Sequence, residues 1–388
     1  MGPKADNLAH ARAVREGLRA RLLELGFDEV RFAAASEVVL PALRSWLDAG
    51  HQADMSWMER TAARRLDPGS IVRGARTVVA LGVTTWRRDS PTDPAKPVWA
   101  RYSRFEDYHD SIGPALERAV EVLAEATGTL PTDSRPYVDT GPVLEREWAR
   151  RAGIGFVGRN AMLISRSHGN WLLLAAILTR AEIPADEPIA SGGTGVGQLC
   201  GSCRRCLDAC PTDAFPAPGV LDARRCISYQ TIENRGFIPR DLRAGIGNRI
   251  FGCDTCLDVC PWNRFARSGR EMLLVPKEGL GEMDLASLLE LTPATFAQRF
   301  RRTAVKRLKL RGLLRNACIV AGNSGDRSLV DRLVALAAHP EPIVRGHAVW
   351  AVHRLVGKTD GAHRLSTARM AEVDAAVLEE HRAAGDPA

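Results

Sequence analysis

Eight of the nine cysteines in this 388-residue chain lie between residues 200 and 260. The first group reads Cys200-Gly-Ser-Cys203-Arg-Arg-Cys206-Leu-Asp-Ala-Cys210-Pro, which is the C-x2-C-x2-C-x3-C-P spacing of runs that hold pairs of four-iron clusters. The second reads Cys253-Asp-Thr-Cys256-Leu-Asp-Val-Cys260-Pro and lacks the first cysteine, for which Cys226 is the natural replacement. A chain with two such clusters handles single electrons.

The spacing also assigns each cysteine to a cluster. Three cysteines at x2 spacing can surround one cluster on a tight loop, whereas the fourth begins a helix that points away and ligates the other cluster. We therefore expect two [4Fe-4S] ligand sets: Cys200, Cys203, Cys206 and Cys260 in one, and Cys253, Cys256, Cys210 and Cys226 in the other.

Zinc knuckles and disulfides are the alternatives for these cysteines. Zinc usually takes C-x2-C pairs without the x3-C-P tail. Disulfides are disfavoured because the chain shows no signal peptide. The ninth cysteine, Cys318, lies in an apolar helical stretch and is expected to be a buried small hydrophobe.

Length and composition predict two or three domains with real cores, since 45% of the residues are hydrophobic. The formal charge of +7 is a modest excess, whose distribution matters more than its total. No run of eighteen apolar residues and no export signal is visible, so we expect a cytoplasmic protein without membrane contact.

The first half of the chain mixes helical and strand patterns without strict βαβ alternation, so the predicted class is α+β. The expected helices are 7–25, 111–127 and 143–152, and the expected strands are 27–35, 77–84 and 137–138. Strand 77–84 is nearly continuous in apolar residues and should be buried on both faces. Segments 162–165 and 171–179 flank Ser-His-Gly-Asn, which predicts a hairpin. The glycine-rich stretch 191–197 predicts a flexible joint.

The pattern after Trp262 is helical alone. Leu314–Ala321 and Val344–Ala351 align position by position, 30 residues apart, with a helix at Leu329–Ala338 between them. This spacing predicts a short helical-repeat array of the HEAT type, which would present an extended surface to a large partner. A plain helical bundle is the alternative.

Residues 299–315 hold eight basic residues and no acidic one. Charge runs are usually solvated helix faces, but such faces generally interleave both signs. A run of one sign at the start of a helical array also suits a phosphate backbone. The candidate nucleic-acid contacts are Arg302, Lys306, Arg307, Lys309, Arg311 and Arg315.

Together these segments resemble the epoxyqueuosine reductase family. The resemblance runs in family order from about residue 55 to 325 and includes both cysteine groups. Its other segments are Ala100-Arg-Tyr-Ser-Arg-Phe-Glu-Asp-Tyr-His109, Asp139-Thr-Gly-Pro-Val-Leu-Glu-Arg146, Ala152-Gly-Ile-Gly-Phe-Val-Gly-Arg-Asn160, Cys226-Ile-Ser-Tyr-Gln-Thr-Ile-Glu233, Cys260-Pro-Trp-Asn263 and Leu313-Leu-Arg-Asn316.

The resemblance implies three domains. They are a cobalamin-binding catalytic α+β domain at 1–190, a ferredoxin-like domain with two 4Fe-4S clusters at 191–270, and a HEAT-like, tRNA-binding domain at 271–388. It implies reduction of epoxyqueuosine to queuosine at the wobble position of a tRNA anticodon, the last step of queuosine biosynthesis. The implied partners are the tRNA and a small electron donor such as flavodoxin or ferredoxin, and the implied state is a monomer.

By motif position, the resemblance makes Asp139 the proton donor for the departing epoxide oxygen. A carboxyl group that carries a proton near neutral pH has to be desolvated. From the residues alone, the favoured role of Asp139 is to cap a helix that begins after Gly141-Pro142.

The resemblance also points to cobalamin contacts at Tyr102 and Asp139, with weaker candidates at Arg60, Asn160, Ser228 and Asp254. Tyr102 could instead be a core aromatic residue. The segment Asp107–Gly113 nearly spells D-x-H-x-x-G, a cobalt-ligating motif, but its glycine falls one place late. His109 is therefore not assigned as a cobalt ligand and is expected to pack or hydrogen-bond near the cofactor.

Two other functions compete with this interpretation. A cobalamin-dependent reductive dehalogenase also pairs cobalamin with two clusters, but it would have no use for the basic helical array. A ferredoxin-type electron carrier docked by its repeats would not need some 190 residues of α/β structure before its clusters.

Overall fold

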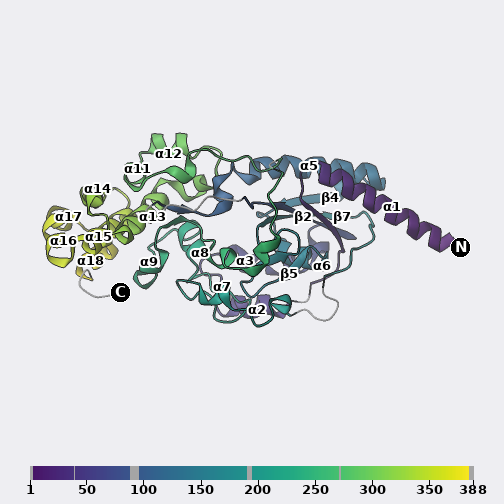
Figure 1. Cartoon of the computed structure of the whole chain (residues 1–388), viewed down its shortest axis with the longest axis horizontal. Helices are drawn as coiled ribbons and strands as arrows, with labels where there is room; N and C mark the ends of the chain where they lie inside the picture. Colours follow the sequence, from purple (N-terminus) through teal and green to yellow (C-terminus); the bar gives the residue numbers. More distant parts are fainter. Residues whose placement is uncertain (1–2, 39, 88–95, 190–194, 271, 384–388) are drawn as a thin grey trace.

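A four-stranded antiparallel sheet organises the first half of the chain, in the order β1-β2-β7-β4 (Figure 1). The strands are β1 (Glu29–Ala34), β2 (Thr77–Thr84), β7 (Leu172–Thr179) and β4 (Ser134–Val138). This computed structural model describes residues 3–38, 40–87, 96–189, 195–270 and 272–383. The first four positions of the expected joint, 191–194, lie outside the described residues.

Strand β2 is buried at every residue, as its apolar sequence predicts. On one face Val79 and Leu81 pack with α1 (Pro3–Glu24) and α5 (Tyr108–Thr127). On the other face Val78 and Ala80 pack with α6 (Glu145–Arg151) through the indole of Trp148. Helices on both faces of a largely antiparallel sheet confirm a mixed α/β architecture for this half.

The predicted hairpin between 162–165 and 171–179 is wrong. Strand β6 (Leu163–Ser165) pairs with β5 (Gly155–Val157), and β7 pairs with β2 and β4 instead. The turn does bring Ser165 and Gly169 together in an isolated bridge, but the pairing stops there. The apolar β7 is better placed in the middle of the sheet than beside a three-residue strand, since the sheet buries both of its faces.

Helix α5 begins at Tyr108, three residues before the predicted start, because Asp107 caps its first turn through His109 N. Between β1 and β2 the chain forms three short helices, α2 (Pro41–Asp48), α3 (Ser56–Arg60) and α4 (Ala62–Leu66). Together these elements place Asp139 and the first turn of α5 near each other at one end of the sheet.

The cysteine region has little regular structure. Its helices are α7 (Arg205–Asp208), α8 (Ile227–Ile232), α9 (Arg240–Ile246) and α10 (Thr255–Asp258), and η5 (Pro261–Phe265) follows. Its single strand β8 (Arg249–Phe251) pairs in parallel with β3 (Val98–Trp99) from the first half of the chain. This pairing joins the cluster region to the sheet domain.

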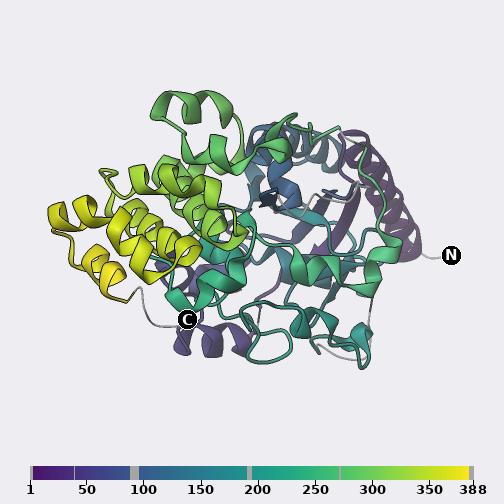
Figure 2. The ribbon, with the colours of Figure 1, turned by 60° about the vertical axis from the view of Figure 1, so that its left-hand side comes forward.

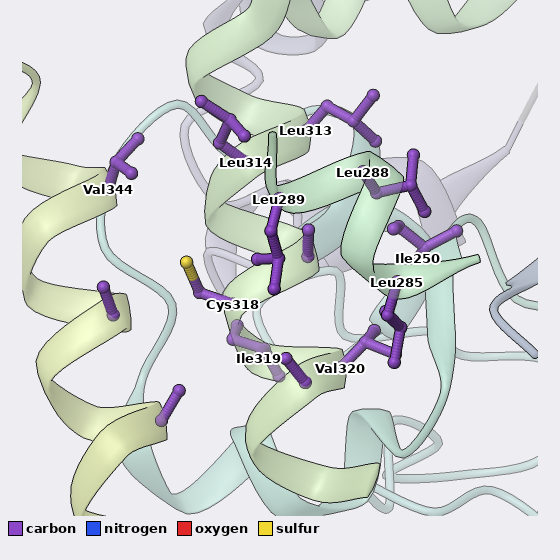
Figure 3. Packing of buried hydrophobic residues seen from close by; sticks show 14 of the residues in the cluster. Ile250, Leu285, Leu288, Leu289, Leu313, Leu314, Cys318, Ile319, Val320 and Val344 are labelled. Atoms are coloured by element: carbon purple, nitrogen blue, oxygen red, sulfur yellow. The ribbon is translucent and has the colours of Figure 1, made fainter. Parts of the chain in front are cut away.

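The last part of the chain is helical. Its helices are α11 (Leu285–Leu289), α12 (Pro293–Arg299), α13 (Lys309–Ser324), α14 (Val330–Leu336), α15 (Pro342–Val356), α16 (Lys358–Arg364), α17 (Ser366–Ala371) and α18 (Ala375–Arg382). Helix α13 packs against α15, and Figure 2 shows these helices stacked at one end of the molecule. Cys318 is fully buried in this core, as expected (Figure 3).

The C-terminal helices and the cluster region share one hydrophobic core. Ile250 of β8 packs in the same cluster as Leu313 and Ile319 of α13, close to Leu285 of α11 (Figure 3). Leu273 and Leu274, which follow residue 271 directly, belong instead to the core of the sheet domain. The packing therefore crosses the predicted boundary at 270/271 in both directions. Among the described residues, no helix is long and apolar enough to cross a membrane.

Candidate functional site

The structure gathers the eight cysteines of the two motifs into two groups of thiols. Burial raises the pKa of Cys206 to about 11, and the thiols that add to this shift are those of Cys200 and Cys260. Burial likewise raises the pKa of Cys226 to about 11, with Cys253 and Cys210 as its neighbouring thiols. Cys203 lies with Cys200, and Cys256 with Cys226. This grouping of the thiols is compatible with the spacing of the cysteines, and the two ligand sets stay a prediction.

Short helical turns hold the thiols. The backbone N–H groups of Ser228 and Tyr229, at the start of α8, point at the Cys226 thiol, and those of Cys206 and Leu207 point at the Cys206 thiol. N–H groups at a helix start favour thiolate, the form that ligates iron. All eight cysteines are free and half-buried. In the described part of the chain, no three His, Cys, Asp or Glu side chains are placed to hold a single metal ion.

Asp139 lies on the turn that follows β4, with a left-handed backbone at φ 59°. Its carboxylate accepts a 2.8 Å hydrogen bond from the Tyr108 hydroxyl. The Nε2 atom of His109 lies 3.7 Å from the same oxygen, and Arg307 lies 3.9 Å from it. Gly141 makes the turn possible, because a Cβ there would stand 2.1 Å from the ring of Tyr137. Asp139 thus sits where the sheet, α5 and the basic stretch meet.

Two expectations about Asp139 change. It does not cap the next helix, because α6 begins at Glu145 with Leu144 as its N-cap. The protein alone does not desolvate it either, because its side chain is 53% exposed. Any desolvation has to come from a bound molecule that covers the turn.

Helix α6 connects Asp139 to the cluster thiols. Arg146 is exposed to solvent, yet desolvation by the protein around it lowers the pKa of its guanidinium. It donates to Ala161 O at 3.0 Å and interacts electrostatically with Asp139, Cys256 and Cys226. Arg146 therefore interacts with both the Asp139 carboxylate and the Cys226–Cys256 cluster site, and we call the region formed by these groups the recess.

Glu145 is the second charged group that α6 brings to this recess. Burial raises its pKa to about 7, and Asp139 adds to the shift. Its Oε1 atom is buried without a hydrogen-bond partner, and so is Nε2 of His109. Polar atoms left unpaired in this way are costly unless a ligand satisfies them. Clusters of perturbed groups in a recess are typical of functional sites.

The predicted cobalamin contacts are placed unevenly around the recess. Burial raises the pKa of Tyr102, whose charged neighbours are Arg307, Asp254, Asp139 and Glu233. Its ring packs edge-on against Tyr108, with centroids 6.1 Å apart. Tyr102 is therefore a packed aromatic residue that also borders the recess.

Asp254 accepts a 2.7 Å bond from Arg101 N, and burial raises its pKa to about 6. Asn160 is buried and reaches Asn170 and the carbonyl of Cys256. Ser228 is half-buried beside the Cys226 ligand. Arg60 is exposed at the end of α3, away from the polar contacts that join the other candidates.

The basic stretch divides into three kinds of residue. Arg302 pairs with Glu106 at 3.0 Å, and Arg311 pairs with Glu341 at 3.4 Å. Arg307 lies between Glu233 at 2.8 Å and Asp139, so it belongs to the recess. Lys306 and Lys309 are exposed and form no ion pair with the described residues. Among the six candidate contacts, these two lysines are the ones most available to a phosphate.

Arg315 is a wrong prediction as a nucleic-acid contact. It is fully buried, and its guanidinium donates to the carbonyls of Gln230, Asn234 and Gly236. These carbonyls belong to the end of α8 and the loop after it, so Arg315 fastens the cluster region to α13. The charge pattern could not separate it from its neighbours, because burial depends on the packing of α13.

Sequence reasoning missed Tyr108, Glu145, Arg146 and Arg65. Arg65 interacts with Glu145 and Asp139, and burial lowers its pKa. Tyr108 and Arg146 lie at the ends of segments that resemble the family, so their position was a usable signal. Arg65 carried no signal, since its role comes from the packing of α4 against the Asp139 turn.

The sequence of the chain matches two family models. Residues 199–263 match the family model for a 4Fe-4S double cluster binding domain. Residues 65–140 match the model for epoxyqueuosine reductase QueG. The epoxyqueuosine reductase of Vibrio cholerae is 34% identical over 87% of this chain and 90% of that protein. The Pseudomonas aeruginosa enzyme is 35% identical over 91% of this chain and 98% of that protein.

Solved structures agree with the sequence matches. A crystal structure of epoxyqueuosine reductase with an epoxyqueuosine-modified tRNA-Tyr stem loop superposes with a TM-score of 0.83 at 29% identity, covering 96% of this chain and 98% of that one. The Bacillus subtilis enzyme, solved with its catalytic aspartate loop swung out of the active site, gives 0.82 at 28% identity and 96% coverage of this chain. The chain is therefore an oxidoreductase with two [4Fe-4S] clusters, and it belongs to the epoxyqueuosine reductase family.

Proposed function

We propose that this protein reduces epoxyqueuosine to queuosine at the wobble position of a tRNA anticodon, with cobalamin and its two clusters as cofactors. The observation that carries the proposal is that Arg146, at the start of α6, interacts with both Asp139 and the Cys226–Cys256 cluster site. In this proposal residues 1–190 hold cobalamin and the catalytic groups, 191–270 form the ferredoxin-like domain, and 271–388 form HEAT-like repeats that bind tRNA.

The residues of the recess fit a corrin. Two buried polar atoms there lack partners, Nε2 of His109 and Oε1 of Glu145. The amide groups on the rim of a corrin offer both donors and acceptors for such atoms. Arg146 and Tyr102 both interact electrostatically with Asp139, and Asn160 and Ser228 lie beside the cluster ligands. When bound, cobalamin supplies a low-valent metal that delivers electrons to carbon.

Asp139 is the proposed proton donor to the oxygen that leaves the epoxide. Removing that oxygen as water takes two electrons and two protons. The Tyr108 hydroxyl holds the Asp139 carboxylate at 2.8 Å and fixes its direction. A modified base that covers the half-exposed turn would exclude water and favour the protonated carboxyl. Arg307, between Glu233 and Asp139, approaches the same carboxylate oxygen of Asp139 that accepts from Tyr108.

The proposed tRNA surface is the η7–α13 junction. Helix η7 (Ala304–Leu308) lies between two residues with left-handed backbone, Arg302 at φ 57° and Lys309 at φ 60°. The structure leaves Lys306 and Lys309 open to solvent, while Arg307 reaches the recess. A backbone phosphate on these lysines would lie on the same junction that contributes a residue to the catalytic turn.

The test is mass spectrometry of tRNA from cells that lack this gene. Epoxyqueuosine should accumulate in place of queuosine, and the wild-type gene should restore queuosine. Asp139→Asn should restore none while the purified variant keeps eight irons and its bound cobalamin, because the amide cannot donate the acid proton. Unchanged queuosine in the deletion strain would refute the function, and queuosine formation by Asp139→Asn would refute the donor.

A further inference from the structure

The two cluster sites differ in what surrounds them. The Cys226 site interacts with Arg146 and, through it, with the catalytic recess. The Cys200 site is enclosed by surface loops in which Gly201, Ser202 and Arg205 are exposed. We call the Cys200 site the outer cluster. Electrons from outside the protein would therefore enter at the outer cluster and pass through the Cys226 site to the recess.

Apolar side chains are exposed around this outer cluster. Val196 is 46% exposed, and Leu199 and Phe265 are each 37% exposed. Trp262 joins them, because its indole Nε1 donates to Leu199 O at 3.3 Å and its ring lies 5.4 Å from that of Phe265. These four residues, which we call the apolar rim, border the loops of Cys200 and Cys260. Such a concentration of exposed large apolar residues marks an interaction surface.

The charge next to the apolar rim is positive. Arg204, Arg205, Arg264 and Arg267 are exposed there, whereas the exposed acidic residues close to them in the sequence are Asp208, 3.4 Å from Arg204, and Asp258, 3.4 Å from Arg101. Arg264 lies over the ring of Phe265 at 4.6 Å, which places a cation directly on the rim. The surface around the outer cluster therefore combines apolar contact area with an excess of positive charge.

We propose that the apolar rim and these arginines form the docking surface for a small, acidic one-electron carrier protein, which delivers electrons to the Cys200 cluster. This proposal rests on the proposed function, since it supplies the electrons that the reaction consumes. At each encounter the reduced carrier loses one electron and the cluster gains one, and two encounters provide the two electrons of one turnover. Positive charge beside the entry point attracts an acidic carrier and raises its association rate.

The surface around the outer cluster lies apart from the helices that precede the proposed tRNA junction. In Figure 1, α7 lies at the lower edge of the molecule, whereas α11 and α12 lie at the upper edge. The proposed tRNA junction, η7–α13, follows α12 in the chain.

The test measures cluster reduction and does not need substrate. Fully reduced flavodoxin, an acidic carrier, is mixed anaerobically with the cluster-loaded protein, and bleaching of the cluster absorbance is followed by stopped flow. Arg264→Glu/Arg267→Glu should slow the second-order rate at least tenfold, and the decrease of the rate with salt should become weak. The control Arg118→Glu/Arg382→Glu reverses the same number of charges on α5 and α18 and should leave the rate unchanged.

Iron content and the rate of reduction by dithionite show whether the clusters of each variant are intact. Arg205→Gln tests the same surface by removing one charge without adding another, and it should slow reduction by flavodoxin less than the double reversal does. Reduction of Arg264→Glu/Arg267→Glu by flavodoxin at the wild-type rate would overturn the proposal, as would an equal loss in the control variant. If wild-type clusters are reduced normally but no queuosine forms, the proposed function fails and the docking surface stands.

Discussion

At the scale of single residues, the catalytic turn combines strain with unpaired polar atoms. Asp139 has a positive φ, and so do Ala161, Arg302 and Lys309, which lie at or near the recess or the tRNA junction. A positive φ at a non-glycine residue costs of order 1 kcal/mol or more, and this conformation persists where the surrounding structure imposes it. The Tyr108–Asp139 hydrogen bond supplies part of that constraint, and it could not be predicted from two residues 31 positions apart.

Glu145 gives a pH-dependent prediction at this scale. Burial raises its pKa from 4.5 to about 7. Below pH 4.5 the carboxyl is protonated in both states and has no effect on stability. Between about pH 4.5 and 7 the unfolded chain ionises first, so the free energy of unfolding falls as pH rises, by up to about 3 kcal/mol. Glu145→Gln should therefore raise the melting temperature at pH 8 and change it little near pH 5.

Glu147, two residues along α6, is the matched control for this prediction. Burial alone would raise the pKa of Glu147. Hydrogen bonds from Arg150 and Arg151 outweigh this effect, so the net shift of its pKa is downward. Glu147→Gln should accordingly lower the melting temperature at pH 8. Anaerobic thermal unfolding followed by circular dichroism compares the two variants. Equal shifts of Glu145→Gln at both pH values would contradict the assigned burial of its carboxyl.

At the scale of elements, the sequence predicted what spacing and periodicity determine. The burial of β2 on both faces followed from an unbroken apolar run, and the double cluster domain followed from the x2 and x3 spacing of the cysteines. The pairing of β6 with β5 was missed, because strand partners depend on how the sheet closes around α6. The charge run before α13 was visible, but which of its members face solvent depends on tertiary packing.

The basic stretch provides a prediction that separates the structural role of Arg315 from the proposed tRNA contacts of Lys306 and Lys309. Arg315→Met should lower the free energy of unfolding by at least about 3 kcal/mol, because it leaves buried carbonyls of Gln230, Asn234 and Gly236 without a donor. Lys306→Gln/Lys309→Gln should change stability by no more than about 0.5 kcal/mol. The lysine variant should weaken anticodon stem-loop binding and reduce the salt slope by about 2, which a filter-binding titration measures. Unchanged affinity would move the tRNA surface away from this junction.

The start of α8 carries a second prediction at this scale. Cys226 is its N-cap residue and lies apart from both cysteine runs, with Cys253 and Cys210 as neighbouring thiols. Cys226→Ala should remove one cluster and leave the other, so iron should fall from about eight to about four per chain if each cluster keeps four irons. Cys318→Ala, which changes the buried ninth cysteine, is the control and should keep both clusters. Eight irons in Cys226→Ala would refute the ligand set.

At the scale of the whole molecule, the three predicted regions are joined more closely than their sequence patterns indicate. Strand β3 from the first region pairs with β8 from the second. Arg315 and Asn316 of α13 donate to carbonyls of the cluster region, including Ile250 O at 2.9 Å. The sequence pattern changes near residues 191 and 262, which indicates three regions. It does not reveal which side chains from different regions fill a common core.

This shared core predicts the result of a truncation. A chain that ends at residue 270 keeps all eight cluster cysteines and every strand, yet it loses the side chains that cover Ile227, Ile250 and Phe251. Burying apolar area contributes roughly 25 cal/mol per Å², so exposing three large side chains costs several kcal/mol, about the whole margin of an ordinary domain. The truncated protein should aggregate or fail to retain iron when it is reconstituted anaerobically. The matched control ends at residue 383, which keeps the helices from α11 to α18 and the buried Arg243–Glu380 ion pair, and it should bind about eight irons. Full iron loading of the 1–270 chain would show instead that the cluster region folds with the sheet domain alone and that the C-terminal helices serve only the tRNA.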